Sequence, residues 1–277
     1  MKNVIKRNGE KDQFDAEKLR KSLRRSGASE SEIERVVEYI TGQMTDGMST
    51  HMLYKLAYAQ LRQKSAKAAG RYRLKKAILD LGPTGFPFEL LVGELLKEKG
   101  FKVQVGIISR GKCVDHELDV VADKPGLRVM VECKFHNDIR RKSDVKVSLY
   151  IQSRFQDMKS AWEKEAGFEN LNYEGWIVTN TRFTEDALQY GNCSGLKLVS
   201  WDYPVGDSLR DMIDKAGFHP ITALHSITNA EKNYLLENEI VLCRTLLKNS
   251  DMLRKLGKSE KQIEKIVNES IQITDLA

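Results

Sequence analysis

Asp119-Val-Val-Ala-Asp-Lys-Pro-Gly-Leu-Arg-Val-Met-Val-Glu-Cys-Lys134 contains the clearest local pattern in this chain. Residues 118–122 and 127–135 are rich in β-branched side chains, which favour strands. The sequence between them, Asp-Lys-Pro-Gly, consists of residues that favour turns. The pattern therefore predicts a β-hairpin.

Side chains alternate between the two faces of a strand, so Glu132 and Lys134 share one face of the second strand. Val131, Cys133 and Phe135 lie on the opposite face and form an apolar layer. Asp119 on the first strand reaches the face of Glu132 and Lys134. Two carboxylates and an ammonium group are therefore expected to converge.

This combination suits the hydrolysis of phosphodiesters. Carboxylate oxygens are the ligands that Mg²⁺ or Mn²⁺ prefers, and a lysine stabilises the negative charge that develops on phosphate. Asp119 and Glu132 are the expected metal ligands. A Glu and a Lys two residues apart also form an ordinary solvated ion pair on many exposed strands. Asp119 and the hairpin favour the site over that alternative.

The same region resembles the PD-(D/E)XK nucleases, in particular the Mrr-like type IV restriction enzymes. The resemblance extends over roughly residues 86–203, with Leu118 at the position of the family's proline. It implies a DNA endonuclease, a role in bacterial antiphage defence, and a set of catalytic residues: Glu89 in Phe-Pro-Phe-Glu, Asp119 in His-Glu-Leu-Asp, Glu132, Lys134, and Gln152 in Tyr-Ile-Gln. Glu89 lies in the first turn of a helix expected over residues 88–99, where it equally suits the helix dipole. Gln152 borders the apolar stripe of a helix expected over residues 147–162 and equally suits an ordinary surface position. That stripe consists of Val147, Ile151, Phe155, Met158 and Trp162.

The N-terminal segment begins with a short apolar run followed by Asn8-Gly9, which favours a hairpin turn. Asp15 is the expected N-cap of a first helix, a second helix is expected over residues 30–40, and Ser49 or Thr50 is expected to cap a third. One further helix is expected from about Ser65 to Leu81. The segment is therefore predicted to be mainly helical.

Three motifs of this segment resemble the ATP cone of ribonucleotide reductases and of their transcriptional repressor. They are Val4-Ile-Lys-Arg-Asn-Gly, Phe14-Asp with Lys18, and Ala69-Gly-Arg-Tyr-Arg. The resemblance implies a regulatory site for ATP or dATP and control through the oligomeric state, so a homo-oligomer is expected. The implied nucleotide-binding residues are Val4, Lys6, Arg7, Asn8, Gly9 and Lys18. No Gly-x-x-x-x-Gly-Lys-Ser/Thr loop is present, so ATP hydrolysis is not predicted.

The chain of 277 residues carries a net charge of +6, and the excess lies in residues 1–82, with 18 Lys and Arg against 10 Asp and Glu. A nuclease needs cations for the DNA backbone, so the near-neutral middle is expected to use the local group Arg140-Arg141-Lys142 with Lys146. The sequence contains no apolar run long enough for a membrane span and no signal peptide. The expected location is the cytoplasm, without membrane contact and with four reduced cysteines.

Leu81-Gly-Pro-Thr-Gly-Phe-Pro breaks the helical pattern and marks a domain boundary. The sequence predicts three domains: an ATP cone over 1–85, an α/β nuclease core with a mixed sheet over 86–203, and a helical domain over 204–277. Helices are expected in the last domain over residues 208–216, 229–237, 244–247 and 259–271. This domain suits either an appendage that binds DNA or a packing and oligomerisation element. The predicted function is a metal-dependent endonuclease regulated by ATP or dATP. The alternative is a non-cleaving, nucleotide-responsive DNA-binding protein built on a nuclease scaffold.

Overall fold

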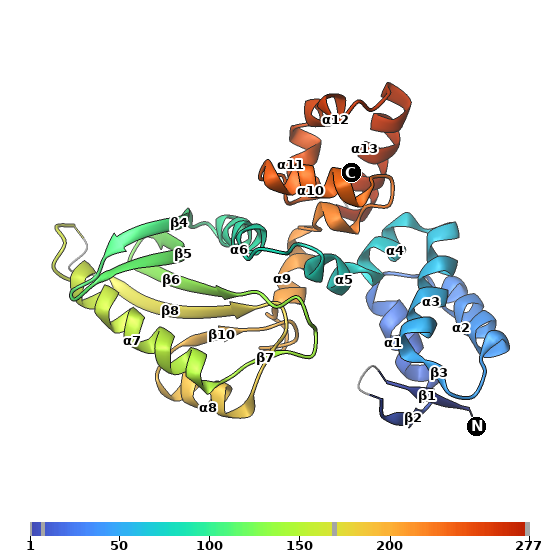
Figure 1. Ribbon diagram of the computed structural model, residues 1–277, viewed down its shortest axis with the longest axis horizontal. Coiled ribbons are helices and arrows are strands. Elements are labelled where there is room, and N and C mark those ends of the chain that lie inside the picture. The colour runs from blue at the N-terminus through green and yellow to red at the C-terminus, as the bar shows by residue number, and fades with distance from the viewer. Residues whose placement is uncertain (1, 7–8, 168–170, 275–277) are drawn as a thin grey trace. The chain divides into compact units, whose positions relative to one another are not determined.

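A computed structural model describes residues 2–6, 9–167 and 171–274 of the chain (Figure 1). The chain divides into two compact units. The first contains residues 1–76, 223–228 and 247–277, and the second contains residues 77–222 and 229–246. None of the helices in the described ranges is long and apolar enough to cross a bilayer.

The first unit begins with a small three-stranded sheet. Strand β1 (Asn3–Ile5) pairs antiparallel with β2 (Lys11–Gln13) and parallel with β3 (Met48–Ser49). The predicted hairpin is confirmed, whereas the short strand β3 was not predicted. Its helices are α1 (Ala16–Arg25), α2 (Glu30–Gln43), α3 (Thr50–Lys64) and α4 (Ala66–Tyr72).

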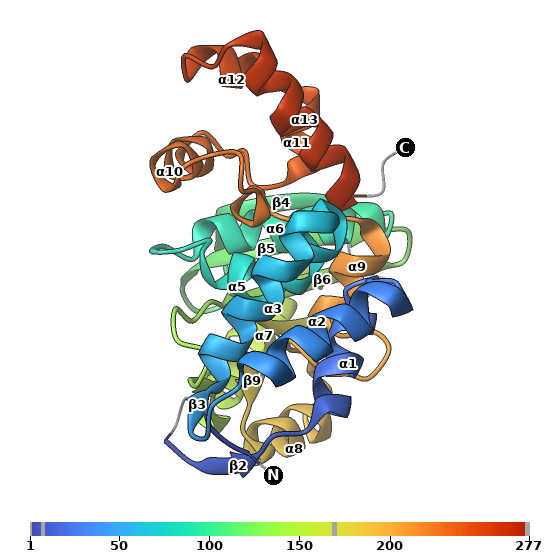
Figure 2. The ribbon, with the colours of Figure 1, turned by 90° about the vertical axis from the view of Figure 1, so that its right-hand side faces the viewer.

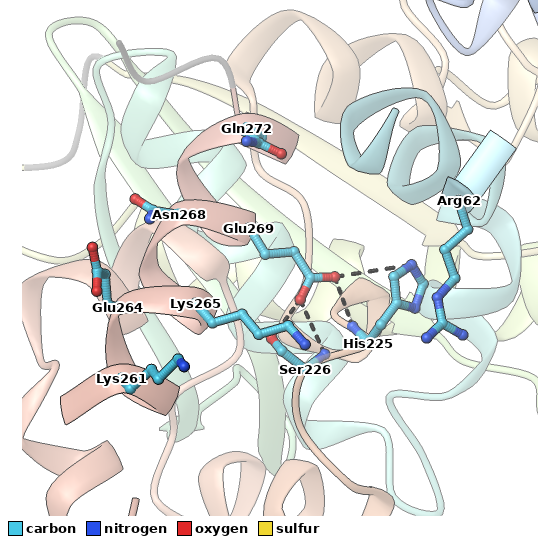
Figure 3. Close-up of a pocket in the computed structure, with 9 residues that line it drawn as sticks. All are labelled: Arg62, His225, Ser226, Lys261, Glu264, Lys265, Asn268, Glu269 and Gln272. Carbon is cyan, nitrogen blue, oxygen red and sulfur yellow. Dashed lines mark hydrogen bonds and ion pairs between the residues drawn. The ribbon is translucent and has the colours of Figure 1, made fainter. Parts of the chain in front are cut away.

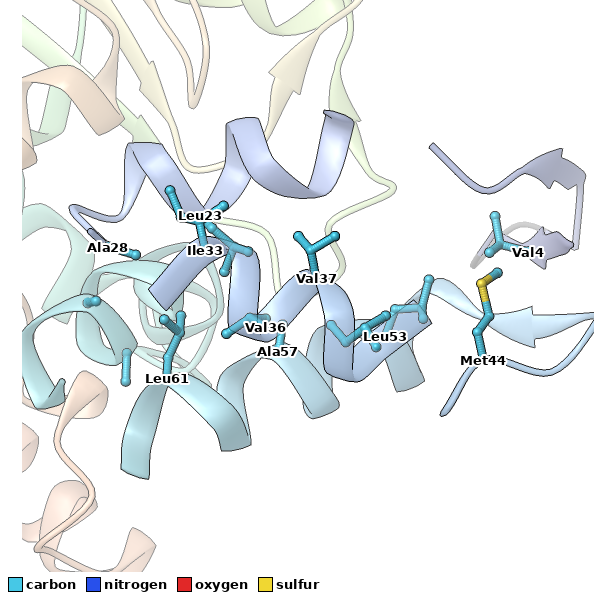
Figure 4. Close-up of a cluster of buried hydrophobic side chains, with 13 residues drawn as sticks. Val4, Leu23, Ala28, Ile33, Val36, Val37, Met44, Leu53, Ala57 and Leu61 are labelled. Atoms are coloured by element: carbon cyan, nitrogen blue, oxygen red, sulfur yellow. The ribbon is translucent and has the colours of Figure 1, made fainter. Parts of the chain in front are cut away.

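Capping residues fix where these helices start, as the sequence predicts. The Asp15 carboxylate accepts the N–H groups of Glu17 and Lys18, and the Ser49 hydroxyl accepts the N–H of Met52. Helices α1, α2 and α3 lie alongside one another (Figure 2). They enclose an apolar core that includes Leu23, Ile33 and Leu61, all without exposed surface (Figure 4).

The prediction of one helix from Ser65 to Leu81 is wrong. The structure has α4 and a separate α5 (Leu74–Leu79), with Arg73 between them. The Arg73 N–H donates to the carbonyls of Ala69 and Arg71, which closes the last turn of α4. The C-terminal helices α12 (Asp251–Lys255) and α13 (Glu260–Thr274) complete the first unit, and α12 was not predicted.

The second unit is built on a five-stranded mixed sheet with the order β10-β8-β6-β5-β4. Strands β4, β5 and β6 are antiparallel, whereas β6, β8 and β10 are parallel, so the predicted mixed sheet is confirmed. The strands are β4 (Lys102–Arg110), β5 (Asp115–Lys124), β6 (Leu127–Lys134), β8 (Asn172–Thr179) and β10 (Lys197–Val199). A small ribbon pairs β7 (Lys142–Ser143) with β9 (Arg182–Phe183).

Helices α7 (Val145–Trp162) and α8 (Glu185–Cys193) cover one face of this sheet. Met130 of β6 packs in one apolar cluster with Ile151 and Phe155 of α7. Residues of β6 that share the face of Met130, namely Glu132 and Lys134, therefore lie on the side of α7. Helix α6 (Phe86–Glu98) packs against β4, β5 and β6, and Phe88 contacts Phe135.

The remaining elements of the second unit follow the sheet in the chain. They are α9 (Leu209–Ala216), a 3₁₀ turn (Ile221–Ala223), α10 (Asn229–Glu237) and α11 (Cys243–Lys248). The last residue of the 3₁₀ turn and the last two residues of α11 belong to the first unit. The predicted helices at 208–216, 229–237 and 244–247 are confirmed. The boundaries predicted for three domains stay a prediction.

Candidate active site

Glu132 is a buried carboxylate held by two cations. Its side chain lies on β6, and the residue is only 4% exposed. Oε1 accepts a hydrogen bond from Lys134 Nζ, and Oε2 accepts one from Arg154 Nη1 at 2.7 Å. A buried carboxylate is costly without such partners, so the two cations explain how Glu132 remains in the core of the fold.

Asp119 lies where the pairing of two strands is interrupted. Val105 pairs with Val120 and Ile107 with Leu118, but the described register has no pair between Gly106 and Asp119. Gly106 has φ +63°, a left-handed conformation that glycine adopts without strain. Such an interruption changes the direction of a side chain. Asp119 Oδ2 accepts the backbone N–H of Cys133 at 2.6 Å, which fixes the carboxylate beside β6.

Glu89 completes a group of acidic side chains. It lies in the first turn of α6, as predicted from the sequence. Burial, followed by repulsion from Asp119, Glu117 and Glu132, raises the pKa of Glu89 to about 7. Burial, followed by repulsion from Glu132, raises the pKa of Asp119 to about 6. The carboxylates are therefore close enough to oppose one another's ionisation, which is common at functional sites.

A hard divalent cation fits this donor set. Neither oxygen of Glu89 nor Oδ1 of Asp119 accepts a hydrogen bond from the described residues. No three His, Cys, Asp or Glu side chains in the described ranges form a ready ligand group. Mg²⁺ commonly binds through one or two carboxylates and completes its shell with water or phosphate oxygens. Asp119 and Glu132 stay the predicted ligands.

Gln152, the fifth residue expected at the site, is not brought into contact with the others. It lies on α7, and it makes no hydrogen bond to Asp119, Glu132 or Lys134 among the described residues. Its Oε1 is buried and has no hydrogen-bond partner there. The structure brings together Glu89, Asp119, Glu132 and Lys134.

Arg154 is a site residue that the sequence reasoning missed. Besides Glu132, it donates to the carbonyl of Glu117 at 3.2 Å and to the hydroxyl of Tyr150 at 2.8 Å. These three acceptors hold the Arg154 guanidinium beside the Glu132 carboxylate. The signal was an arginine directly before Phe155, inside the apolar stripe of α7.

A second candidate site is a cavity of about 390 Å³ in the first unit. Val4, Lys6 and Lys18, three of the residues expected to bind the nucleotide, line it. Both lysines face Asp12, with Nζ to Oδ2 distances of 3.1 Å for Lys6 and 3.8 Å for Lys18. The hydrogen bond from Lys6 is the main reason that the pKa of Asp12 is lowered.

Aromatic rings form another wall of this cavity. Tyr54 and Tyr72 line it, and their rings stack at 5.2 Å. Gly9 adopts φ +87° in the turn between β1 and β2 and is not among the lining residues. Arg7 and Asn8, also expected to bind the nucleotide, lie outside the described residues. Lysines and flat rings are the groups that bind phosphates and a base.

Comparisons with known families divide the chain in the same order as the sequence analysis. The ATP cone domain family matches residues 2–78. The family described as restriction endonuclease, of the Mrr type, matches residues 83–203. A third family, described as AF1548-like, C-terminal, matches residues 219–274 and was not predicted.

Individual proteins are also similar to this chain. An uncharacterised protein from Archaeoglobus fulgidus is 34% identical over 183 residues, which cover 66% of this chain and 99% of the relative. The crystal structure of the protein of unknown function AF1548 is 31% identical with a TM-score of 0.57, covering 70% of this chain and 100% of that one. A more distant match is the MspJI restriction endonuclease with a 27-mer oligonucleotide, 17% identical with a TM-score of 0.35, covering 63% of this chain and 35% of that one. The chain belongs to the AF1548-like family and carries an ATP cone domain ahead of a restriction endonuclease-like domain of the Mrr type.

Proposed function

We propose that the protein is a divalent-metal-dependent DNA endonuclease whose activity responds to an adenine nucleotide bound in the cone. The observation that carries the proposal is the convergence of Glu89, Asp119, Glu132 and Lys134 at the β5–β6 hairpin, where the pKa values of Asp119 and Glu89 are raised. A scaffold without chemistry has no need for mutually repelling carboxylates in a partly buried position.

Asp119 and Glu132 would hold the divalent cation. When bound, it would polarise the scissile phosphate and acidify a water molecule. Glu89, with a pKa of about 7, is suited to exchange a proton with that water near neutral pH. Lys134 and Arg154 both contact the Glu132 carboxylate. Their positive charges would stabilise the negative charge that develops on the phosphate.

The DNA backbone would be bound by the basic segment that follows the active strand. Arg141, Lys142 and Lys146 are exposed, and within the described ranges no carboxylate lies within ion-pair distance of them. Arg140 differs, because it forms a 2.6 Å ion pair with Asp138. Three available cations of the four expected from the sequence support contact with phosphates in this segment.

The nucleotide would bind in the cavity lined by Lys6, Lys18 and Tyr54. Asp12 forms ion pairs with both lysines. The contact with Asp12 places both lysines side by side at the cavity. A triphosphate carries more negative charge than one carboxylate, so it would replace Asp12 as the partner of both lysines. Tyr54 and Tyr72 offer ring faces for adenine. The cone is proposed to act by changing the assembly of a homo-oligomer.

The experiment that tests this proposal is plasmid cleavage by the full chain with Mg²⁺ or Mn²⁺, with EDTA, and with ATP or dATP. Cleavage is expected only with metal, at a rate that changes with the nucleotide. Asp119→Asn and Glu132→Gln should abolish it, because each removes a metal ligand and keeps the side-chain volume. DNA binding without cleavage under every metal condition would favour the non-cleaving alternative.

A biological role is part of the same proposal. The resemblance to type IV restriction enzymes suggests defence against foreign DNA in the cytoplasm, where both DNA and adenine nucleotides occur. The test is phage plating on cells that express the chain. Equal plating on cells with the natural protein and with Asp119→Asn would contradict a defence role without affecting the proposed chemistry.

A further inference from the structure

A cavity of about 510 Å³ lies in the first unit, separate from the two sites above. It is lined by Arg62 of α3, by His225 and Ser226, and by one face of α13 (Figure 3). It shares no lining residue with the cavity of Lys6 and Lys18. Its volume is in the range of pockets that bind small molecules.

Buried hydrogen bonds build the floor of this cavity. Glu269 of α13 is 9% exposed, and its carboxylate accepts the N–H groups of His225 at 2.8 Å and Ser226 at 3.0 Å. It also accepts the Ser226 hydroxyl. From the other side, the Tyr58 hydroxyl lies 2.6 Å from His225 Nδ1. The segment 225–226 is therefore held between α3 and α13, and the cavity is preformed.

The packing of α13 against α4 also fixes the cavity. A Cβ atom added to Gly70 of α4 would lie 2.7 Å from Ile273 Cδ1, so the two helices approach closely at this point. Ile273 has no exposed surface. Close packing of this kind keeps α13, with its polar face, at a constant distance from the cone.

Three cations line the rim without an acidic partner. Arg62, Lys261 and Lys265 have no carboxylate within ion-pair distance in the part of the chain that the structure describes. Arg20 and Arg24 of α1, by contrast, each bind one glutamate through two nitrogens. The cavity therefore brings together three cations that are free to contact an added anion.

The two lysines also repel each other. Lys261 and Lys265 lie four residues apart on α13, and like charges at this spacing destabilise a helix. Arg62 from α3 brings a third positive charge to the same space, and its side chain extends past His225 in Figure 3. Glu269, one of the two acids in the lining, is already bound by backbone N–H groups. An anion would offset the repulsion.

We propose that this cavity binds a phosphorylated small molecule of about nucleotide size, with its phosphate held by Arg62, Lys261 and Lys265. Asn268 and Gln272 follow on the same face of α13 and line the cavity beside these cations. Their amides donate and accept hydrogen bonds, which suits a base or sugar attached to the phosphate. The concave form and the volume favour a small molecule over a DNA duplex.

The test measures the binding of inorganic pyrophosphate and of adenosine monophosphate to the full chain by calorimetry. Arg62→Ala and Lys265→Ala are expected to weaken pyrophosphate binding at one site by a factor of about 10 each, since each removes one charged contact. Lys255→Ala is the matched control, because Lys255 is an exposed lysine of α12 that does not line the cavity. It should bind both probes as the natural protein does.

A second variant separates this cavity from the cone. Lys18→Ala should weaken only the other site, so that the two losses of binding are independent of each other. The proposal is overturned if Arg62→Ala and Lys265→Ala bind both probes like Lys255→Ala. It is also overturned if they leave both probes unaffected and instead lose binding of a DNA duplex, because the cations would then serve nucleic acid.

Discussion

Arg154 and Glu132 form an ion pair in which Nη1 lies 2.7 Å from Oε2, and both side chains are largely buried, at 15% and 6% exposed. Arg154→Ala leaves Glu132 with Lys134 alone. Breaking a buried pair costs about 3–5 kcal/mol because one charge remains without its partner. The midpoint of thermal unfolding should therefore fall by several degrees, and cleavage should slow by at least about 10-fold.

The control is Arg182→Ala, which removes an exposed arginine from its pair with Asp202. Exposed pairs contribute about 0–1 kcal/mol, so its unfolding midpoint and cleavage rate should remain near those of the natural protein. If Arg154→Ala unfolds and cleaves like Arg182→Ala, the guanidinium is neither a structural nor a functional part of the site.

Lys134→Ala should separate catalysis from binding. Lys134 Nζ contacts Glu132, but the side chain is one third exposed, so the fold should tolerate its loss. Turnover is expected to fall by a factor on the order of 10² or more, because charge on the transition state is no longer stabilised. Metal and DNA affinities should change little. Unchanged turnover in single-turnover cleavage would assign Lys134 a structural role.

The sequence predicted those parts of the fold in which apolar residues recur with the period of a strand or a helix. Alternation in β6 placed Glu132 and Lys134 on one face, and Ile151, Phe155, Met158 and Trp162 formed the buried stripe of α7 as expected. The hairpins and caps followed from turn residues and from Asp15 and Ser49. Glu89, Asp119, Glu132 and Lys134 lie together, and their roles stay predictions.

Other features of the structure have no corresponding periodic pattern in the sequence. The interruption at Asp119 depends on Gly106 of the neighbouring strand, and Arg154 interrupts an apolar stripe without a spacing rule of its own. The cavity under Arg62 joins α3 to α13, which are far apart in the chain. Contacts of this kind depend on tertiary packing, so local patterns could not predict them.

The acidic group predicts how stability depends on pH. The pKa values of Asp119 and Glu89 in the folded protein, about 6 and about 7, exceed the value near 4 of an unfolded chain. Between these values the folded state binds more protons than the unfolded state. The free energy of unfolding therefore falls as pH rises from about 4 to about 7, when metal is absent.

Unfolding midpoints measured with EDTA across this range should show the fall. Glu89→Gln should make the pH dependence shallower, because one of the two groups no longer titrates and one charge near Asp119 is removed. Mg²⁺ should raise the midpoint more at pH 7 than at pH 5, since protons compete with the metal for the carboxylates. An identical pH dependence in Glu89→Gln would show that the pKa of Glu89 is not raised in the folded protein.

The basic segment predicts the salt dependence of DNA binding. Each of Arg141, Lys142 and Lys146 that neutralises a phosphate contributes close to one unit to the slope of log affinity against log salt. The triple alanine variant should therefore lower this slope by about 2–3 for a short duplex. Arg140→Ala should change it less, since Arg140 already pairs with Asp138. An unchanged slope in the triple variant would place the DNA on another surface.

If the cone regulates the protein, its molar mass in solution and its cleavage rate should respond together to adenine nucleotides. ATP or dATP shifts activity only if it binds one assembly more tightly than another, and a tenfold preference corresponds to about 1.4 kcal/mol of coupling. Light scattering and plasmid cleavage across a titration of each nucleotide should therefore give the same midpoint. Lys18→Ala should move both midpoints to at least about tenfold higher nucleotide, because it removes a cation that lines the cavity.

Cleavage without nucleotide should be the same in Lys18→Ala and in the natural protein, since Lys18 belongs to the first unit and the candidate active site to the second. Lys21→Ala is the matched control: Lys21 is exposed on the same helix and does not line the cavity. If the control shifts the midpoints as far as Lys18→Ala, the effect is one of general charge. If neither mass nor rate responds to saturating ATP or dATP, the cone does not regulate cleavage, while the metal-dependent site remains open to its own test.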